Sequence, residues 1–141
     1  MRPKTIDPYI RSMESLLGNT RRPDVSFFKN GRIDITASVA KKLNLGNGDV
    51  IDIARCDREL YLYVKWRNHD VVGNHTARCK TTKSKGRCAN FRAFSVKLCA
   101  SILEICNAEN VVRLAAGDAI HVEGIGAAVP LVTRINLHNN D

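Results

Sequence analysis

Two cations, Lys29 and Arg32, stand on either side of an Asn30-Gly31 pair between β-prone segments. Asn-Gly is the strongest short-range hairpin signal, because both residue types tolerate positive φ. A two-residue loop would make Lys29 and Arg32 cross-strand neighbours, and like charges directly opposite each other cost stability. An unfavourable pair of like charges at a tight turn favours a functional role for the two cations. The sequence therefore predicts a hairpin tip that faces an anion.

A second group of cations lies further along the chain, with Thr, Ser and Gly among them and no acid. It comprises Arg78, Lys80, Lys83, Lys85 and Arg87. The 141-residue chain carries a formal charge of +8, and residues 55–97 hold 11 basic against 3 acidic side chains. This asymmetry favours a polyanionic partner, nucleic acid first, over a loop whose lysines only aid solubility. We expect residues 68–90 to form a mobile basic loop rather than regular structure.

Other kinds of chemistry have weaker support. The carboxylates show no spacing typical of an acid/base pair, and the chain has no nucleophile elbow, P-loop or dinucleotide fingerprint. Four candidate zinc ligands lack a close Cys-x-x-Cys pair and stand in a basic segment that opposes a dication: His69, His75, Cys79 and Cys88. We therefore expect no catalytic residue, no metal and no cofactor.

One predicted strand has a face that combines aromatic rings with cations. Its members are Tyr61, Tyr63, Lys65 and Arg67. Such a face suits stacking on single-stranded bases and contact with phosphates. We favour the alternative, in which the two rings cover a neighbouring strand or helix.

The patterning predicts short elements that position these residues. The expected strands are Val25–Phe28, Arg32–Ile35, Val50–Ala54, Leu60–Trp66, Phe91–Phe94, Val111–Leu114, Ala119–Val122 and Val129–Leu137. Pro130 should place the last of these at a sheet edge or at a strand start. The expected helices are one opened by Asp7-Pro8, one from about Ala37 to Leu43 capped by Thr36, and one from about Val96 to Cys106 capped by Ser95.

The composition is that of an ordinary globular protein, with 44% hydrophobic and 26% charged residues. No apolar run approaches a membrane span, and Met1-Arg2-Pro3-Lys4 lacks the apolar core of a signal peptide. Five cysteines are an odd number without framework spacing, which favours a reducing compartment. We expect a cytoplasmic protein with one domain, or two small units that share a core.

The second half of the chain echoes the first. Gly31-Arg32, a strand, a helix and Gly48-Asp49-Val50-Ile51 parallel a later series of the same order. That series is Gly86-Arg87, a strand, a longer helix and Gly117-Asp118-Ala119-Ile120. The order of elements, rather than residue identity, suggests a degenerate internal repeat.

Residues 25–66 resemble the swapped-hairpin module of AbrB, MazE and SpoVT-type transcription factors and antitoxins. The resemblance rests on Gly31-Arg32 before a strand, a short helix ending in Leu43-Asn44-Leu45, and Gly48-Asp49-Val50-Ile51. In that family, hairpins from two protomers interleave into a small β-barrel, and basic side chains on one face hold DNA. The resemblance implies the same fold here, as an intramolecular pseudo-dimer of two strand-helix-hairpin units or as a true homodimer.

The resemblance also implies which side chains contact DNA. Arg32 follows the family glycine, Lys29 belongs to the preceding strand, and Lys41 stands at a basic position of the short helix, with Lys42 one place on. Thr36 replaces the usual proline, and Ala40 stands where another basic residue is frequent. The expected DNA-binding residues are thus Lys29, Arg32, Lys41 and Lys42, joined by the cations of the basic loop.

Together these observations predict a mostly β fold with short helices (α+β), forming a swapped-hairpin-like barrel. We expect an N-terminal helical arm over residues 1–24, a first unit over 25–67, the basic loop over 68–90 and a second unit over 91–141. The predicted function is a DNA-binding transcriptional regulator, with duplex DNA as the expected partner. The alternative is a non-catalytic protein-interaction module, antitoxin-like or an accessory protein of a mobile element, in which the barrel is only a scaffold.

Overall fold

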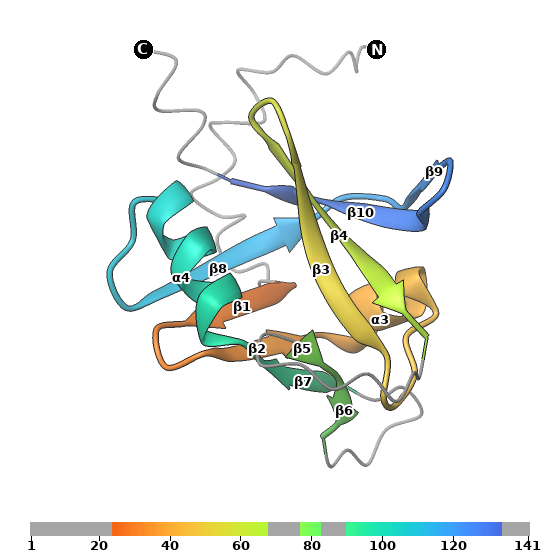
Figure 1. Ribbon diagram of the computed structural model, residues 1–141, viewed down its shortest axis with the longest axis horizontal. Helices are drawn as coiled ribbons and strands as arrows, with labels where there is room; N and C mark the ends of the chain where they lie inside the picture. The colour runs from red at the N-terminus through yellow and green to blue at the C-terminus, as the bar shows by residue number, and fades with distance from the viewer. Residues whose placement is uncertain (1–23, 68–76, 83–89, 134–141) are drawn as a thin grey trace, which may run out of the picture.

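The computed structural model describes residues 24–67, 77–82 and 90–133 (Figure 1). The strands are β1 (Val25–Phe28), β2 (Arg32–Ile35), β3 (Val50–Cys56), β4 (Glu59–Trp66), β5 (Ala77–Arg78), β6 (Lys80–Thr81), β7 (Phe91–Phe94), β8 (Val111–Ala116), β9 (Ile120–Val122) and β10 (Gly126–Val132). The helices are α3 (Ala37–Leu43) and α4 (Val96–Ile105). The predicted N-terminal arm lies outside the described residues, as do Lys83, Lys85 and Arg87.

The strands form a nearly closed antiparallel barrel, which confirms the mostly β prediction with short helices. The sheet order is β5-β3-β4-β10-β8-β1-β2-β7-β6, with β9 paired to β10. β5 and β6 are short neighbours on one segment, and they pair with opposite ends of that order, β5 with β3 and β6 with β7. This segment therefore closes the barrel.

Part of the predicted basic loop is thus regular structure, and the prediction of a loop throughout 68–90 was wrong at this point. Arg78 lies opposite Val50 on β3, and Lys80 lies opposite Arg92 on β7. Cys79, between the two short strands, is fully buried and exchanges backbone hydrogen bonds with the loop before β3. The sheet edges on either side supply ladder partners that overcome the poor strand propensity of this polar segment.

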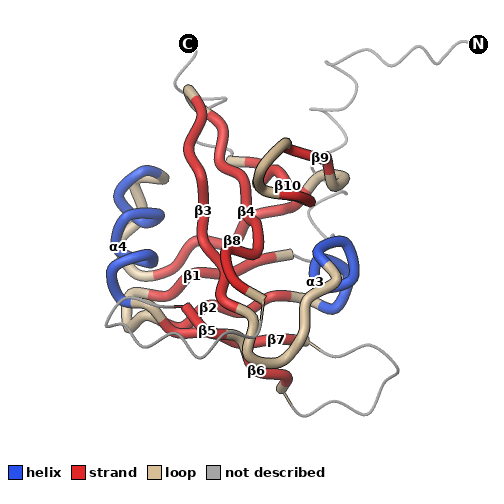
Figure 2. Tube along the Cα trace, turned by 45° about the vertical axis from the view of Figure 1, so that its right-hand side comes forward, coloured by secondary structure: helices blue, strands red, loops and turns tan. Residues whose placement is uncertain are grey.

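Alternation along the strands builds the core, as the sequence predicts. Leu60, Leu62 and Val64 of β4 are buried, while Tyr61 and Tyr63 between them are only half-buried. β1 and β2 contribute four more inward side chains: Val25, Phe27, Ile33 and Ile35. α4 packs against β1, β2 and β8, whereas α3 packs against β10. Figures 1 and 2 place the two helices at opposite ends of the barrel.

The β1–β2 hairpin has a three-residue loop, not the predicted two-residue one. Phe27 lies opposite Ile33, so the loop is Lys29-Asn30-Gly31. The amide of Gly31 donates to the carbonyl oxygen of Phe28 at 2.9 Å, and Gly31 alone in the loop has a positive φ, of 104°. This is the turn-plus-glycine geometry of three-residue hairpins. Lys29 and Arg32 are therefore not cross-strand neighbours, and the predicted repulsion does not arise.

The two predicted helices that fall in the described residues begin where expected, but only one has the predicted cap. The hydroxyl of Ser95 accepts from the amide of Leu98 at 3.1 Å. Thr36 makes no side-chain cap bond; instead, the amide of Ala37 donates to the side-chain oxygen of Asn90 at 2.8 Å. Asn44 ends α3 in the left-handed conformation, with φ 53°, as its residue type suggests.

Pro130 lies inside β10, contrary to the prediction of an edge or a strand start. It stands opposite Tyr61 of β4, and its carbonyl oxygen accepts from the amide of Gly117 at 2.9 Å. Two residues that face each other in this way in an antiparallel ladder normally exchange two backbone hydrogen bonds. Pro130 has no N–H to donate the second bond, so the carbonyl oxygen of Gly117 accepts from Nζ of Lys42 instead, at 2.9 Å. A side chain at Gly117 would also meet the ring of Pro130, because a Cβ there would lie 3.0 Å from Cγ.

The predicted internal repeat matches two Gly-Asp pairs that do not occupy equivalent places in the fold. Gly48-Asp49 stands immediately before β3, whereas Gly117-Asp118 follows β8 and leads to β9. The last strand is Gly126–Val132 rather than Val129–Leu137, and residues 134–137 lie outside the described ranges. The Gly-Asp pairs resemble each other because both are turn residues, not because they occupy equivalent places.

Candidate nucleic-acid interface

Two rows of side chains cross the outward face of β8, β1, β2, β7 and β6, which Figure 2 shows lying one beside the next. In the first row, Val111 lies opposite Phe28, and Arg32 lies opposite Phe94. The second row continues across all five strands: Arg113, Ser26, Asp34, Arg92 and Lys80. We call these nine residues the cationic face, because they include four cations and one carboxylate.

Phe28 and Asp34 organise the arginines of the cationic face. The guanidinium carbon of Arg32 lies 4.1 Å from the ring centre of Phe28, and that of Arg113 lies 5.7 Å from it. Asp34 accepts from Nε of Arg92 at 2.8 Å and lies 3.3 Å from Nη2 of Arg32. Stacking on a ring and pairing with a carboxylate restrict the rotamers of these long side chains. The arginines are therefore held in place before any ligand arrives.

An apolar patch adjoins the cationic face where β7 leads into α4. Phe94 is 58% exposed and Val96 is 65% exposed. The hairpin tip packs against this corner, because the amide of Ser95 donates to the carbonyl oxygen of Gly31 at 2.8 Å. A Cβ on Gly31 would lie 2.9 Å from Cγ2 of Val96. The tip, Phe94 and the start of α4 thus form one continuous surface.

The predicted DNA-binding residues fall into separate groups. Arg32 and Lys80 belong to the cationic face, and the exposed side chain of Lys29 stands at the hairpin tip beside it. Lys41 is exposed on α3, which follows the opposite end of β2 from the tip. The structure does not bring it together with Lys29 and Arg32.

Two of the predicted cations have structural partners. Nζ of Lys42 donates to the carbonyl oxygen of Gly117 and lies 3.9 Å from the carboxylate of Asp118. Nη1 of Arg78 donates to the carbonyl oxygen of Gly48 at 2.9 Å. Both side chains tie one element of the barrel to another, and their contact with DNA stays a prediction. Lys83, Lys85 and Arg87 lie outside the described residues.

Sequence reasoning missed two of the four cations of the cationic face, Arg92 and Arg113. Each alternates with buried neighbours, Arg92 with Phe91 and Ala93, and Arg113 with Leu114. That alternation was a usable signal for an outward cation. It could not reveal that β8 and β7 share a sheet with the β1–β2 hairpin, because those pairings join segments far apart in the chain.

The aromatic strand face predicted as a second candidate serves structural contacts. The hydroxyl of Tyr61 bonds to Glu59, which raises the pKa of Tyr61. Burial and the nearby Asp52 carboxylate raise the pKa of Tyr63. Arg67 donates to the carbonyl oxygens of Leu43 and Asn44, at 2.9 and 2.6 Å, and holds the end of α3. Of the two tyrosine contacts, that of Tyr63 reaches the neighbouring strand β3, whereas that of Tyr61 stays on β4, so the covering of a neighbouring element by both rings stays a prediction.

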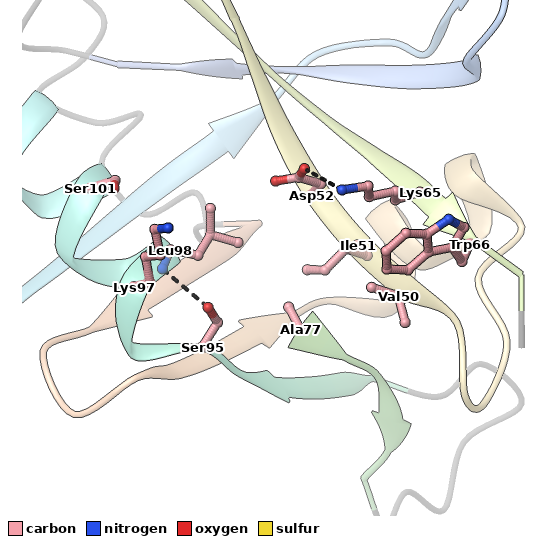
Figure 3. Close-up of a pocket in the computed structure, with 10 residues that line it drawn as sticks. All are labelled: Val50, Ile51, Asp52, Lys65, Trp66, Ala77, Ser95, Lys97, Leu98 and Ser101. Atoms are coloured by element: carbon pink, nitrogen blue, oxygen red, sulfur yellow. Dashed lines mark hydrogen bonds and ion pairs between the residues drawn. The ribbon is translucent and has the colours of Figure 1, made fainter. Parts of the chain in front are cut away.

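An open groove of about 410 Å³ lies between the start of α4 and strands β3 and β4 (Figure 3). Three of its polar side chains have partners: Lys65 lies 3.9 Å from Asp52, and the hydroxyl of Ser95 accepts from the amide of Leu98. The ammonium of Lys65 also lies 4.6 Å from the ring centre of Trp66. Lys97 and Ser101 of α4 also line the groove, and Figure 3 shows no hydrogen bond or ion pair between their side chains and the other lining residues.

Among the described residues, no group of three or more His, Cys, Asp or Glu side chains could hold a metal ion. Burial, with a smaller effect of Asp49, raises the pKa of Cys79 to about 12, so its thiol stays protonated at neutral pH. The other zinc candidates, His69, His75 and Cys88, lie outside the described ranges. Neither helix in this part of the chain has the length and apolar content to cross a membrane.

The cationic face can thus offer phosphate groups four donors, two of them stacked beside an aromatic ring, with an exposed phenylalanine in the same surface. Comparison with known proteins finds no matching family, no similar curated protein and no similar solved structure.

Proposed function

We propose that this protein binds nucleic acid through the cationic face and the hairpin tip, as a DNA-binding regulator. The observation that carries the proposal is the register of the second row. It places Arg113, Arg92 and Lys80 on one outward face with Ser26 and Asp34. Arg32 adds a fourth cation from the first row, and Lys29 stands beside it at the tip. Phosphate contacts by such cations release counterions and supply affinity that is independent of sequence.

Asp34 pairs with two arginines of the face, although its own charge weakens the attraction of an anion. Its carboxylate pairs with Arg92 and Arg32, so it orients their guanidinium groups without neutralising Arg113 or Lys80. Arginine forks recognise phosphate oxygens in pairs, and an oriented fork loses less entropy when it binds. The face remains positive overall.

We also propose that the barrel is a pseudo-dimer of two related units. The strand order supports this, because β4 pairs with β10 and β2 pairs with β7. The β4–β10 pair is flanked by β3 and β8, and the β2–β7 pair by β1 and β6. The order of neighbours around the barrel stays the same when each element of one unit is exchanged for its counterpart in the other. The counterparts are β1 and the β5–β6 segment, β2 and β7, α3 and α4, β3 and β8, and β4 and β10. The β6–β7 connection then corresponds to the hairpin tip, and its sequence holds Lys83, Lys85 and Arg87. One chain closes the barrel, so we expect a monomer by light scattering.

One observation favours the rival function, a protein-interaction module. Phe94 and Val96 are adjacent in space to the tip and expose apolar surface. An acidic protein partner could use the same cations with this patch as its apolar centre. Salt would weaken the binding of such a partner too, so the two functions are separated by whether the protein binds oligonucleotides at low salt.

The test is fluorescence anisotropy of labelled single-stranded and duplex oligonucleotides of equal length across a sodium chloride series. We expect binding at low salt, with log Kd rising linearly with log salt concentration. The double variant K80A/R113A removes two outward cations and should lower that slope by about 1.5 to 2. Binding that is absent at low salt, or a slope that the double variant leaves unchanged, would refute the proposal.

A further inference from the structure

We infer that the cationic face takes single-stranded rather than duplex nucleic acid, with an unpaired base stacked on the ring of Phe94. This inference rests on the proposed function, because it names the form of nucleic acid that the same face accepts. Phe94 is 58% exposed and lies in register with Arg32, whose guanidinium stacks on Phe28. A singly exposed phenylalanine needs no explanation. Phe94 does need an explanation, because it stands in one row with an arginine that stacks on a ring, beside a second row of cations.

The shape of the surface excludes the groove of a duplex as its main target. The cationic face spans five neighbouring strands, from β8 to β6. The major groove of DNA is wide enough for an α-helix or a two-stranded ribbon. A five-stranded sheet is much wider than either of these elements. A duplex lying across the sheet would present only phosphates, and the ring of Phe94 would find no base face to cover. Its apolar surface would contribute nothing to duplex affinity.

A single strand presents both parts that the two rows require. Its unpaired bases expose ring faces, which stack on aromatic side chains and on guanidinium planes. Phe94 and Arg32 offer these two kinds of platform on adjacent strands. Its phosphates can follow the second row, where Arg113, Arg92 and Lys80 stand. Stacking is tolerant of sequence, so the expected preference is for unpaired over paired bases, not for one base.

The exposure of Phe94 also makes the inference testable, because its ring does little for the fold. The buried side chains of β7 are Phe91 and Ala93, while Phe94 points outward. A control is Ile120, an exposed apolar residue of β9, which lies on the other part of the sheet next to β10. Substituting either residue removes apolar surface from solvent rather than from the core.

The experiment compares three labelled ligands at low salt: oligo-dT, an abasic strand of the same length, and a duplex of the same length. Wild-type protein should bind oligo-dT at least about tenfold more tightly than the abasic strand or the duplex. F94A should lose about tenfold for oligo-dT and nothing for the abasic strand, whereas F94W should keep wild-type affinity. I120A should bind all three ligands as the wild type does.

The outcomes separate this inference from the proposed function. Equal affinity for all three ligands, with F94A unchanged, would overturn the stacking inference and leave phosphate binding by the face intact. Binding of none of the ligands at low salt would overturn both. A loss in F94A that is equal for oligo-dT and the abasic strand would also refute stacking, because it would show a general disturbance of the face.

Discussion

The side-chain nitrogen of Lys42 lies 2.9 Å from the carbonyl oxygen of Gly117, which is 75 residues away in the chain. Gly117 has this oxygen available because Pro130, which accepts from the Gly117 amide, has no N–H to return. Lys42, which the sequence suggests as a DNA contact, therefore supplies the hydrogen bond that the β-ladder lacks at Pro130. The lysine joins α3 to the connection after β8.

Lys42→Met should destabilise the fold by about 1 kcal/mol, because the carbonyl of Gly117 loses its charged donor in a half-buried position. Lys41→Met is the matched control, since Lys41 is exposed on the same helix, and its stability should stay within about 0.5 kcal/mol of wild type. Urea denaturation followed by circular dichroism measures both. Equal stability of the two variants would contradict the assigned bond.

Asn90→Ala should cost about 1 kcal/mol, because the amide of Ala37 at the start of α3 loses its cap. Thr36→Val should be neutral or slightly stabilising, since the buried hydroxyl of Thr36 has no hydrogen-bond partner among the described residues. Thermal melts of the two variants give the comparison. A larger loss for Thr36→Val than for Asn90→Ala would restore Thr36 as the cap and refute this assignment.

Stability should fall as the solution becomes strongly alkaline, in part because of Cys79. Burial raises the pKa of its thiol from 9.0 to about 12, so the folded state holds a proton that the unfolded state releases. The contribution is fully present below pH 9, weakens above it, and is lost as the pH passes the folded value. Denaturation midpoints of wild type and Cys79→Ala between about pH 8 and pH 11 test this, because other titrating groups are common to both. Parallel pH profiles would contradict it.

Asp34→Asn should tighten binding of a nucleic acid to the cationic face several-fold at low salt. The change removes the carboxylate that pairs with Arg92 and Arg32, so both guanidinium groups keep more charge for phosphate. The gain should disappear at high salt, where such effects are screened. Anisotropy titrations at two salt concentrations measure it, and a loss of affinity at low salt would show that orientation of the arginines matters more than charge.

Much of the fold follows from local patterns in the sequence. Alternation along Leu60 to Trp66 identified β4 and its buried side, and β1, β2 and β7 have the predicted bounds. Errors arose where distant partners decide the outcome. β5 and β6 are strands because β3 and β7 border them, and Asn90 replaces Thr36 as a cap across the fold. The three-residue loop depends on Gly31 alone taking positive φ, which an Asn-Gly pair does not specify.

The candidate site shows the same division between local and distant information. Arg32 was predicted from its charge beside a turn and Lys80 from its place in the basic loop, and the fold puts both on one face. Arg113 was missed because its partner Phe28 is far from it in sequence, on a strand that pairs with β8 only in the folded barrel. The bond from Lys42 to Gly117 was not predicted, because nothing in the segment around Lys42 indicates the proline on β10.

The most direct test of the central claim compares two charge reversals. Arg113→Glu changes the cationic face, whereas Arg55→Glu makes the same change on β3, in the β3–β4 hairpin that Figure 1 shows pointing away from β1, β2 and β7. We predict that Arg113→Glu weakens low-salt binding of oligo-dT by about tenfold or more, while Arg55→Glu changes it less than about twofold. Equal losses in the two variants, or a larger loss for Arg55→Glu, would contradict the claim that this face binds nucleic acid.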